Sequence, residues 1–365
     1  RCDVAVLGGG AAGLMCAIEA GKRGRRVLML ERSERVGKKI LISGGGRCNF
    51  TNLYAGPDNY LSANPHFCRS ALARYSPSGF VDLVERHRIA YHEKELGQLF
   101  CDGSARQIVE MLLAECRAAG VQVRTGCEIA SAERTGTGFR VSTSQDTLDC
   151  AALVVATGGL SVPKMGATDF GYRLARSFGH TILPPRAGLV PLTFGEPELT
   201  RYGELAGVSL PAEIRHGRIA FSGGMLFTHR GLSGPPVLQI SSYWEPGAEL
   251  IVDLAPGRDA AAWLENWRME RPDALLSTAL AERLPQRLAK RLAETVLDNR
   301  LLRQFRDADL QSVAEALSRW RVRPMGTEGY RTAEVTLGGV NTRELSSTTM
   351  ESALVHGLYF IGEVV

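Results

Sequence analysis

The glycine cluster from Gly8 to Gly13 constrains the fold of this chain more than any other feature. Its string GGGAAG satisfies the pattern G-x-G-x-x-G and follows an apolar run, residues 3–7, that predicts a buried strand. Residues 14–23 then predict a helix, and residues 26–30 predict a second strand. Glycines between a strand and a helix are typical of the first turn of a dinucleotide-binding βαβ unit. The sequence therefore predicts an α/β fold with a cofactor phosphate at this turn.

Each glycine of the motif has its own physical role in this prediction. Gly8 permits the tight turn, Gly10 lets a pyrophosphate approach the backbone, and Gly13 lets helix and strand pack closely. The N-terminus of the helix offers free N–H groups and a partial positive charge to the phosphate, and we place Ala11 and Ala12 in this cofactor site. An ordinary glycine-rich turn is the structural alternative.

Glu31 stands at the end of the second predicted strand, 18 residues after Gly13. That is near the spacing expected for an acid that binds a ribose 2′-hydroxyl, and we place Arg32 in the same site. An acid here argues against a 2′-phosphate, and hence against NADP, but it does not separate NAD from FAD.

Two later segments favour FAD. Residues 151–159, AALVVATGG, are an apolar run that ends in Ala-Thr-Gly, and residues 357–363 read GLYFIGE. Both resemble FAD-contact segments of flavoproteins with two dinucleotide folds, in which the second segment carries an acid that binds the ribityl chain. The resemblance adds as candidate site residues Ala156, Thr157, Gly158, Gly362 and Glu363.

The whole chain resembles one bacterial family, the NAD(P)/FAD-dependent flavoproteins related to the bile-acid reductase BaiN, with aminoacetone oxidase and uncharacterised HI-type flavoproteins. The strings that carry the resemblance are GKKILISGGGRCNFTN, LFTHRGLSGPPVLQISSYW, AEVTLGGVNTRELSSTTMES and GLYFIGEVV. The resemblance implies a FAD/NAD(P)-binding, Rossmann-like two-dinucleotide-fold domain and an oxidoreductase activity. The reaction we favour is hydride transfer at flavin N5, to or from an activated C=C bond of a small organic substrate.

The loop from residue 38 to residue 52 contains three consecutive glycines. If FAD occupies the first site, these glycines would let backbone N–H groups approach the pyrophosphate and the flat ring. Lys39 and Arg47 could neutralise a phosphate or a negative charge on the flavin, although a surface salt bridge is an alternative for Arg47. The candidates in this loop are Lys39, Ser43, Gly44, Gly45, Gly46, Arg47 and Cys48.

Cysteine spacing argues against redox and metal chemistry. None of the eight cysteines forms a CxxC pair, so neither a zinc site nor a dithiol motif is indicated. Cys48 has no cysteine a few residues away, which favours a structural role over charge transfer with the flavin. With no secretory leader and no apolar stretch long enough for a membrane span, we expect a cytoplasmic protein with reduced thiols and no membrane partner.

Charge is the basis for a prediction about partners. The formal net charge is only +4, six of the 43 Lys and Arg residues are lysines, and no run of five basic residues occurs. We therefore expect a small-molecule substrate and no nucleic acid. The oligomeric state stays open.

The domain organisation follows from the change of pattern near residue 188. Residues 1–187 and 331–365 predict a discontinuous FAD-binding domain, 188–256 an inserted antiparallel β subdomain, and 257–330 an inserted helical bundle. Within the first part, residues 104–120 predict a helix capped by Ser104, and residues 121–129 predict a strand. By position, that strand resembles the segment whose backbone contacts adenine, near Ile129. No second GxGxxG follows, so any NAD(P)H would bind only transiently.

Two polar residues of the insert, His229 and Arg230, are candidates for a substrate site. His229 could supply a proton and Arg230 could hold a carboxylate, but a loop stapled by its own hydrogen bonds is an equal alternative. Two rival functions remain, a NAD-only dehydrogenase and a flavoprotein that senses or modifies a macromolecular partner.

The ends of the sequence carry one further expectation. The chain starts at Arg1, so we expect its natural start to be lost. In the resembled family a glycine-rich loop and a helix follow the acid at position 363, whereas this sequence stops at Val365. We expect the loop from Gly44 to Cys48 to be displaced without that element.

Overall fold

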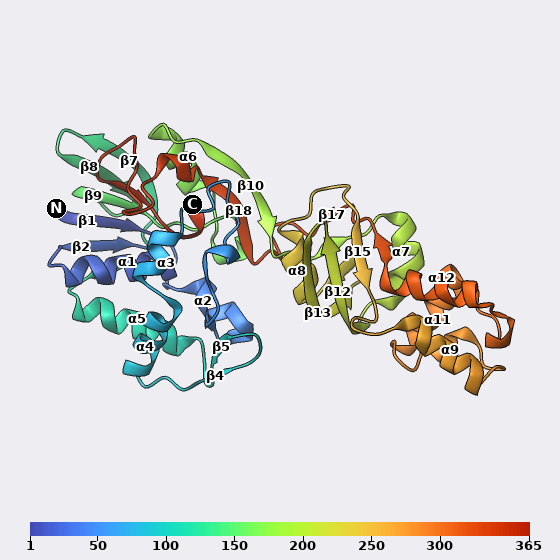
Figure 1. Cartoon of the computed structure of the whole chain (residues 1–365). Helices are drawn as coiled ribbons and strands as arrows, with labels where there is room; N and C mark the ends of the chain where they lie inside the picture. Colours follow the sequence, from blue (N-terminus) through green and yellow to red (C-terminus); the bar gives the residue numbers. More distant parts are fainter. The chain divides into compact units, whose positions relative to one another are not determined.

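The computed structural model describes all 365 residues, which form two compact units (Figure 1). Unit 1 is Arg1–Pro185 with Gly338–Val365, and unit 2 is Arg186–Leu337. The chain passes from one unit to the other within β10 (Ile182–Gly188) and returns within β18 (Val335–Val340). The sequence predicts these changes at 187/188 and 330/331, whereas the compact units change at 185/186 and 337/338.

Unit 1 is built on a seven-stranded sheet whose centre is parallel. The strand order is β6 (Gln122–Arg124), β2 (Val27–Leu30), β1 (Cys2–Leu7), β9 (Thr147–Val155), β8 (Gly138–Thr143) and β7 (Ile129–Thr135). The short strand β19 (Leu358–Phe360) also pairs with β9, in parallel. Because β1 is parallel to both β2 and β9, the carboxyl ends of three strands meet at one edge.

Alternating side chains of these strands bury both faces of the sheet. Val6 and Met29 pack with α1 (Ala11–Lys22) and α5 (Arg106–Ala118), while Leu7 and Leu30 belong to the core on the other face. That second core also holds buried residues of α6 (Phe170–Ser177). Helices on both sides of a parallel sheet are the α/β arrangement that the glycine motif predicts.

A smaller layer of unit 1 precedes α5. It contains α2 (Lys38–Ile42), a three-stranded sheet in the order β3 (Asn49–Asn52), β5 (Gln98–Cys101) and β4 (Tyr91–Glu93), and the helices α3 (Arg69–Arg74) and α4 (Pro77–Arg86). The structure corrects three local predictions here. The loop at 38–52 starts with a helix, α5 starts after Ala105 rather than at Ser104, and the strand at 121–129 is only the three-residue β6.

Unit 2 combines an antiparallel sheet with a helical bundle, as the predicted fold class requires. The sheet order is β16 (Trp320–Val322), β15 (Leu250–Asp253), β12 (Ser209–His216), β13 (Ile219–Phe227), β14 (Gly231–Ser233), β11 (Leu192–Thr193) and β17 (Gly326–Thr327). The helices are α7 (Glu196–Tyr202), α8 (Pro235–Ser241), α9 (Ala260–Glu270), α10 (Leu276–Leu280), α11 (Gln286–Leu292) and α12 (Asp307–Ser318). One core joins the sheet and the helices of this unit, so the predicted fold class is confirmed. None of the helices in the structure has the length and apolar character that crossing a membrane requires.

A buried hydrogen-bond network holds the last strand of unit 1 in place. The ring of His180, which is 3% exposed, lies edge-on to Phe360 of β19, with 4.9 Å between ring centroids. Its Nδ1 lies 3.1 Å from Oε2 of Glu344, and its Nε2 lies 2.7 Å from Oγ of Ser352. Because Ser352 Oγ already accepts two backbone N–H groups, its own hydrogen is free to donate to Nε2. A neutral imidazole with its proton on Nδ1 therefore donates to Glu344 and accepts from Ser352, so both ring nitrogens are hydrogen-bonded.

The network predicts a pH-dependent stability. Burial lowers the pKa of His180 below its ordinary value of 6.5, so the unfolded chain binds a proton that the folded chain rejects. The free energy of unfolding should therefore fall as the pH falls below about 6.5. His180→Ala should cost about 1–3 kcal/mol at pH 7, since buried partners lose a hydrogen bond.

Urea unfolding of the wild type and of His180→Ala between pH 7 and pH 5 measures both effects. His356→Ala, at a side chain that is 92% exposed, is the matched control. An equally steep pH dependence in wild type and His180→Ala would rule out this source of acid sensitivity.

Candidate functional site

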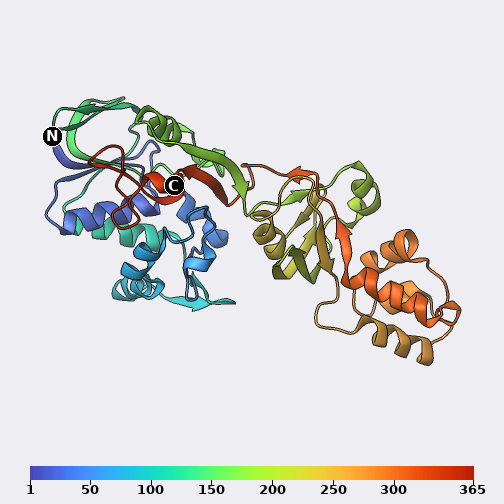
Figure 2. The ribbon, with the colours of Figure 1, turned by 45° about the horizontal axis from the view of Figure 1, so that its top comes forward.

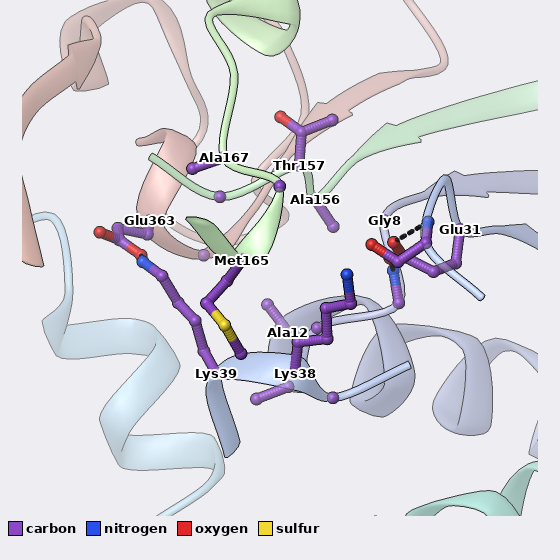
Figure 3. Close-up of a pocket in the computed structure, with 18 of the residues that line it drawn as sticks. Gly8, Ala12, Glu31, Lys38, Lys39, Ala156, Thr157, Met165, Ala167 and Glu363 are labelled. Atoms are coloured by element: carbon purple, nitrogen blue, oxygen red, sulfur yellow. Dashed lines mark hydrogen bonds and ion pairs between the residues drawn. The ribbon is translucent and has the colours of Figure 1, made fainter. Parts of the chain in front are cut away.

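A cavity of about 330 Å³ opens at the carboxyl ends of β1, β2 and β9 in unit 1 (Figure 3). This is the edge of a parallel sheet at which dinucleotides bind. The predicted site residues that line it are Gly8, Gly10, Ala11, Ala12, Glu31, Lys39, Ala156, Thr157, Gly158, Gly362 and Glu363.

The glycines of the motif differ in what surrounds them, as their predicted roles require. A Cβ at Gly8, whose φ is +111°, would lie 2.3 Å from the carbonyl oxygen of Ala156. One at Gly13 would lie 1.9 Å from the carbonyl oxygen of Gly8, so no side chain fits between α1 and β1. A Cβ at Gly10 would have no protein atom within 4 Å, although Gly10 lines the cavity. Two glycines thus serve packing, and the third leaves room for a ligand.

Glu31 fixes one end of the cavity. Its Oε2 accepts the N–H of Gly9 at 2.7 Å, and its Oε1 accepts the N–H of Ser33 at 2.7 Å. An ionised carboxylate has about four acceptor positions, so two N–H donors leave capacity for ligand hydroxyl groups. The side chain therefore holds the glycine turn in shape and remains able to bind a ribose.

At the opposite end of the cavity, Lys39 and Glu363 line the wall (Figure 3) and form a polar cluster with Ser161. Nζ of Lys39 lies 2.7 Å from Glu363 Oε2 and 2.5 Å from Ser161 Oγ, and Ser161 Oγ donates to Glu363 Oε1 at 2.7 Å. The three residues come from α2, from the loop after β9 and from the turn after β19. This cluster thus joins three distant parts of the chain at one point.

The electrostatics between the two ends favour an anion. Gly10 is the N-cap of the 12-residue helix α1, so the first N–H groups of that helix face the cavity unpaired. Arg35 and Lys38 also line the cavity and have no ion-pair partner, whereas Lys39 is already neutralised by Glu363. A diphosphate would therefore meet a helix N-terminus and two free cations.

These features fit FAD. The carboxylate of Glu31 suits an adenosine ribose, the open space over Gly10 suits a pyrophosphate, and Glu363 at the far end suits the hydroxyl groups of the ribityl chain. Gly362 supports this arrangement, because a Cβ there would come within 2.7 Å of Cβ of Ala12. Only a glycine lets the segment after β19 approach the start of α1.

Other predicted site residues do not line this cavity. Gly13 lies behind the turn, and Ile129 begins β7, packed against a core. Arg32 donates from Nη2 to the carbonyl oxygen of Gly166, a residue that does line the cavity, at 3.2 Å. The remaining residues form a separate loop after α2: Ser43, Gly44, Gly45, Gly46, Arg47 and Cys48. Their contact with a flavin ring stays a prediction.

The loop after α2 has a defined conformation. Gly44, Gly45 and Gly46 all have positive φ values, of 56°, 66° and 87°. Cys48 follows with a φ of 52° and is 5% exposed. Burial raises the pKa of the Cys48 thiol, which disfavours the thiolate that redox chemistry needs.

The candidates of the insert lie in unit 2. His229 and Arg230 are exposed at the turn between β13 and β14. Oγ1 of Thr228 accepts hydrogen bonds from the N–H groups of Arg230 and Gly231, so the Thr228 side chain stabilises the turn. Their role with a substrate stays a prediction.

About half of the residues that line the cavity are not among the predicted site residues. The missed residues are Gly9, Ser33, Arg35, Gly37, Lys38, Ile40, Gly159, Met165, Gly166 and Ala167. Several flank the motifs directly and could be found by extending each motif by a few residues. Met165, Gly166 and Ala167 lie several residues beyond the nearest motif, so extending the motifs would not find them.

Comparison with known proteins identifies the family. The model of the HI0933-like protein Rossmann domain matches residues 2–365. This chain belongs to the HI0933-like family. Its α/β cofactor site and its family identify it as a flavoprotein oxidoreductase.

Three relatives match this member of the HI0933-like family over nearly its full length. A ribosomal RNA dihydrouridine synthase of Escherichia coli is 52% identical over 100% of this chain and 92% of its own. A protein of the same name from Haemophilus influenzae is 45% identical over 99% and 91%. A 3-dehydro-bile acid delta(4,6)-reductase of Clostridium scindens is 29% identical over 99% and 92%, which accords with the BaiN resemblance.

The prediction that no nucleic acid is a partner is contradicted by the first two relatives, because both are named for a reaction on ribosomal RNA. The prediction rested on how basic residues are spaced along the sequence. That spacing does not show which side chains share a surface after folding, and it is therefore a poor guide to RNA binding.

Proposed function

We propose that this flavoprotein reduces the C5=C6 double bond of a uridine in ribosomal RNA, with FAD as its cofactor. The observation that carries the proposal is the 52% identity, over the whole chain, with a ribosomal RNA dihydrouridine synthase. Dihydrouridine is uridine with that bond saturated. The proposed reaction is thus a two-electron reduction of an activated C=C bond.

The chemistry of the third relative supports the same reaction type. Its name describes reduction of double bonds in a 3-dehydro bile acid, which carries a carbonyl at position 3. In uridine the C5=C6 bond is conjugated with the C4 carbonyl, so hydride addition at C6 places negative charge on that carbonyl and C5 then takes a proton. A conjugated C=C bond is the feature that the two substrates share.

The residues of the cavity would hold the cofactor in an extended form. Glu31 would bind the adenosine ribose, and the N-terminus of α1 with Arg35 and Lys38 would bind the pyrophosphate. Glu363, oriented by Lys39 and Ser161, would bind the ribityl chain. When bound and reduced, FAD supplies the hydride from N5 of its ring. We propose NAD(P)H as the transient electron donor, since no second glycine motif offers it a permanent site.

The test is formation of dihydrouridine by purified, yellow protein. Ribosomal RNA and intact ribosomal subunits from cells that lack this enzyme would be incubated with the protein and NADH or NADPH. Mass spectrometry of the nucleosides should then detect uridine carrying two added hydrogens. Absence of that product with flavin-loaded protein and both nicotinamide donors would refute the proposed function, and a colourless protein that binds only NAD would refute the flavin.

A further inference from the structure

The small sheet β3–β5–β4 of unit 1 has one buried face and one open face. The buried face packs Phe50 against Phe80 and Tyr91, at centroid distances of 6.0 and 5.5 Å. On the open face the register places Asn49 opposite Phe100, and Phe100 opposite His92. The register pairs Asn52 with Gln98 after a shift between Asn49 and Thr51, and strand residues two apart share a face. The open face therefore consists of Asn49, Asn52, His92, Lys94, Gln98 and Phe100.

The open face combines an aromatic ring with polar and cationic groups. The His92 ring is stacked near Phe100, at a centroid distance of 6.3 Å and an interplanar angle of 19°. Nζ of Lys94 lies 5.6 Å from the centre of the Phe100 ring. Three side-chain amides surround these groups. Such a surface is too polar for a typical protein-docking patch, but it offers stacking and hydrogen bonds together.

The end of this sheet presents two large side chains to solvent. Tyr54 is 73% exposed and Leu96 is 75% exposed. The ring of Tyr54 lies against Gly97, where a Cβ would come within 2.6 Å of Tyr54 Cδ2. Nδ2 of Asn52 donates to the carbonyl oxygen of Leu96, and the N–H of Leu53 donates to that of Gly97. The tip is thus ordered, and it projects from the body of unit 1 (Figure 2).

The open face adjoins the glycine loop after α2. A Cβ at Gly44 would lie 2.6 Å from Cε1 of Phe100, so the loop rests directly on that ring. This is the loop that we expect to contact the flavin. A substrate bound on the open face would therefore lie next to the segment predicted to reach the reactive ring.

Two basic and three acidic side chains surround the open face. Arg47, at the end of the loop, and Lys94 have no ion-pair partner. Of the acidic neighbours, Asp102 is paired with His92 at 2.6 Å and Glu93 accepts the N–H of Gly97. Glu95 is exposed, and none of these three carboxylates forms an ion pair with a lysine or an arginine. Two cations are thus available to phosphates.

We propose that the open face, with Tyr54 at its tip, binds a single-stranded segment of ribosomal RNA beside the target uridine. Unstacked bases would stack on Tyr54 and on the Phe100–His92 pair, the amides of Asn49 and Gln98 would bind base edges, and Lys94 and Arg47 would contact phosphates. This inference rests on the proposed function, in which the surface beside the flavin loop has to accommodate an RNA.

The test measures RNA binding and dihydrouridine formation in separate experiments. Fluorescence anisotropy with a labelled single-stranded oligouridine, across a range of salt concentrations, would be measured for wild type, Tyr54→Ala and Lys94→Gln. Tyr54→Ala should weaken binding about tenfold and leave the salt slope unchanged, because stacking releases no counterions. Lys94→Gln should reduce the slope of log affinity against log salt by about 0.7, the value for one phosphate contact on a single strand.

Matched controls separate these effects from general damage. Tyr75→Ala removes another exposed tyrosine of unit 1, and Lys290→Gln removes an exposed lysine of unit 2. Both should bind RNA as the wild type does, and all four variants should keep the flavin spectrum. Dihydrouridine formation in ribosomal RNA should fall only in Tyr54→Ala and Lys94→Gln.

The outcomes distinguish failure of this inference from failure of the proposed function. If the wild type forms dihydrouridine and Tyr54→Ala and Lys94→Gln do so equally well, the RNA surface lies elsewhere. If those variants change only the sedimentation of the protein, the open face pairs two copies of the chain and the inference is refuted. If the wild type neither binds nor modifies ribosomal RNA, the proposed function itself fails, and the inference fails with it.

Discussion

Gly10→Val should yield a folded protein that contains no flavin. A Cβ at Gly10 would meet no protein atom within 4 Å, and its φ of −78° suits any residue. The valine side chain would therefore occupy only the space over the helix N-terminus, where we place the pyrophosphate. Loss of close contact between backbone N–H groups and phosphate should abolish retention of the cofactor.

The measurement is the flavin absorbance of the purified variant, beside its circular dichroism and thermal unfolding. Gly136→Val is the matched control, because a Cβ there also meets no atom within 4 Å and Gly136 lies far from the cavity in the β7–β8 turn. Gly13→Val should instead fail to fold, since its Cβ would overlap the carbonyl oxygen of Gly8. A yellow Gly10→Val protein would show that the cofactor does not cross this turn.

Glu31→Ala should weaken FAD binding by about 1–3 kcal/mol, the cost of losing a buried hydrogen bond to a charged group. The structure adds a second reason for the loss. Without the carboxylate, the N–H groups of Gly9 and Ser33 lose their acceptor, so the glycine turn is less well held. Both effects act at the end of the cavity where we place the adenosine ribose, so both contribute to the expected loss of FAD affinity.

The dissociation constant of FAD, measured by fluorescence quenching of the free cofactor, checks this prediction. Glu34→Ala removes an exposed carboxylate three residues away and should leave the constant unchanged. Unaltered FAD retention by Glu31→Ala after dialysis would exclude Glu31 from the ribose site.

The sequence predicts the first half of the cofactor site well because that half is local. The strand, the turn, the helix and Glu31 lie within one stretch of about 30 residues, and each glycine has a steric reason that its neighbours reveal. The fold class follows from the same stretch together with the change to antiparallel patterning after residue 188.

The second half of the site depends on contacts that no local pattern contains. Lys39 pairs with Glu363 across 324 positions of the sequence, and Ser161 joins them from a third segment. From the neighbouring sequence alone, Lys39 is predicted to neutralise a phosphate. In the folded protein it forms an ion pair with the carboxylate of Glu363. The open face of the small sheet cannot be predicted from local sequence either, because its strands β3 and β5 are separated by about 45 residues. For the same reason, the charge spacing gives a wrong prediction about RNA.

The Lys39–Ser161–Glu363 cluster also sets the order in which the protein can mature. Lys39 and Ser161 leave the ribosome before unit 2 is made, and Glu363 leaves after it. Translating unit 2 takes roughly 10–30 seconds at bacterial elongation rates. During that interval β9 has no β19 beside it, and the ribityl end of the cavity lacks its acid. The complete cavity, including its ribityl end, thus forms only after unit 2 and β19 have been synthesised.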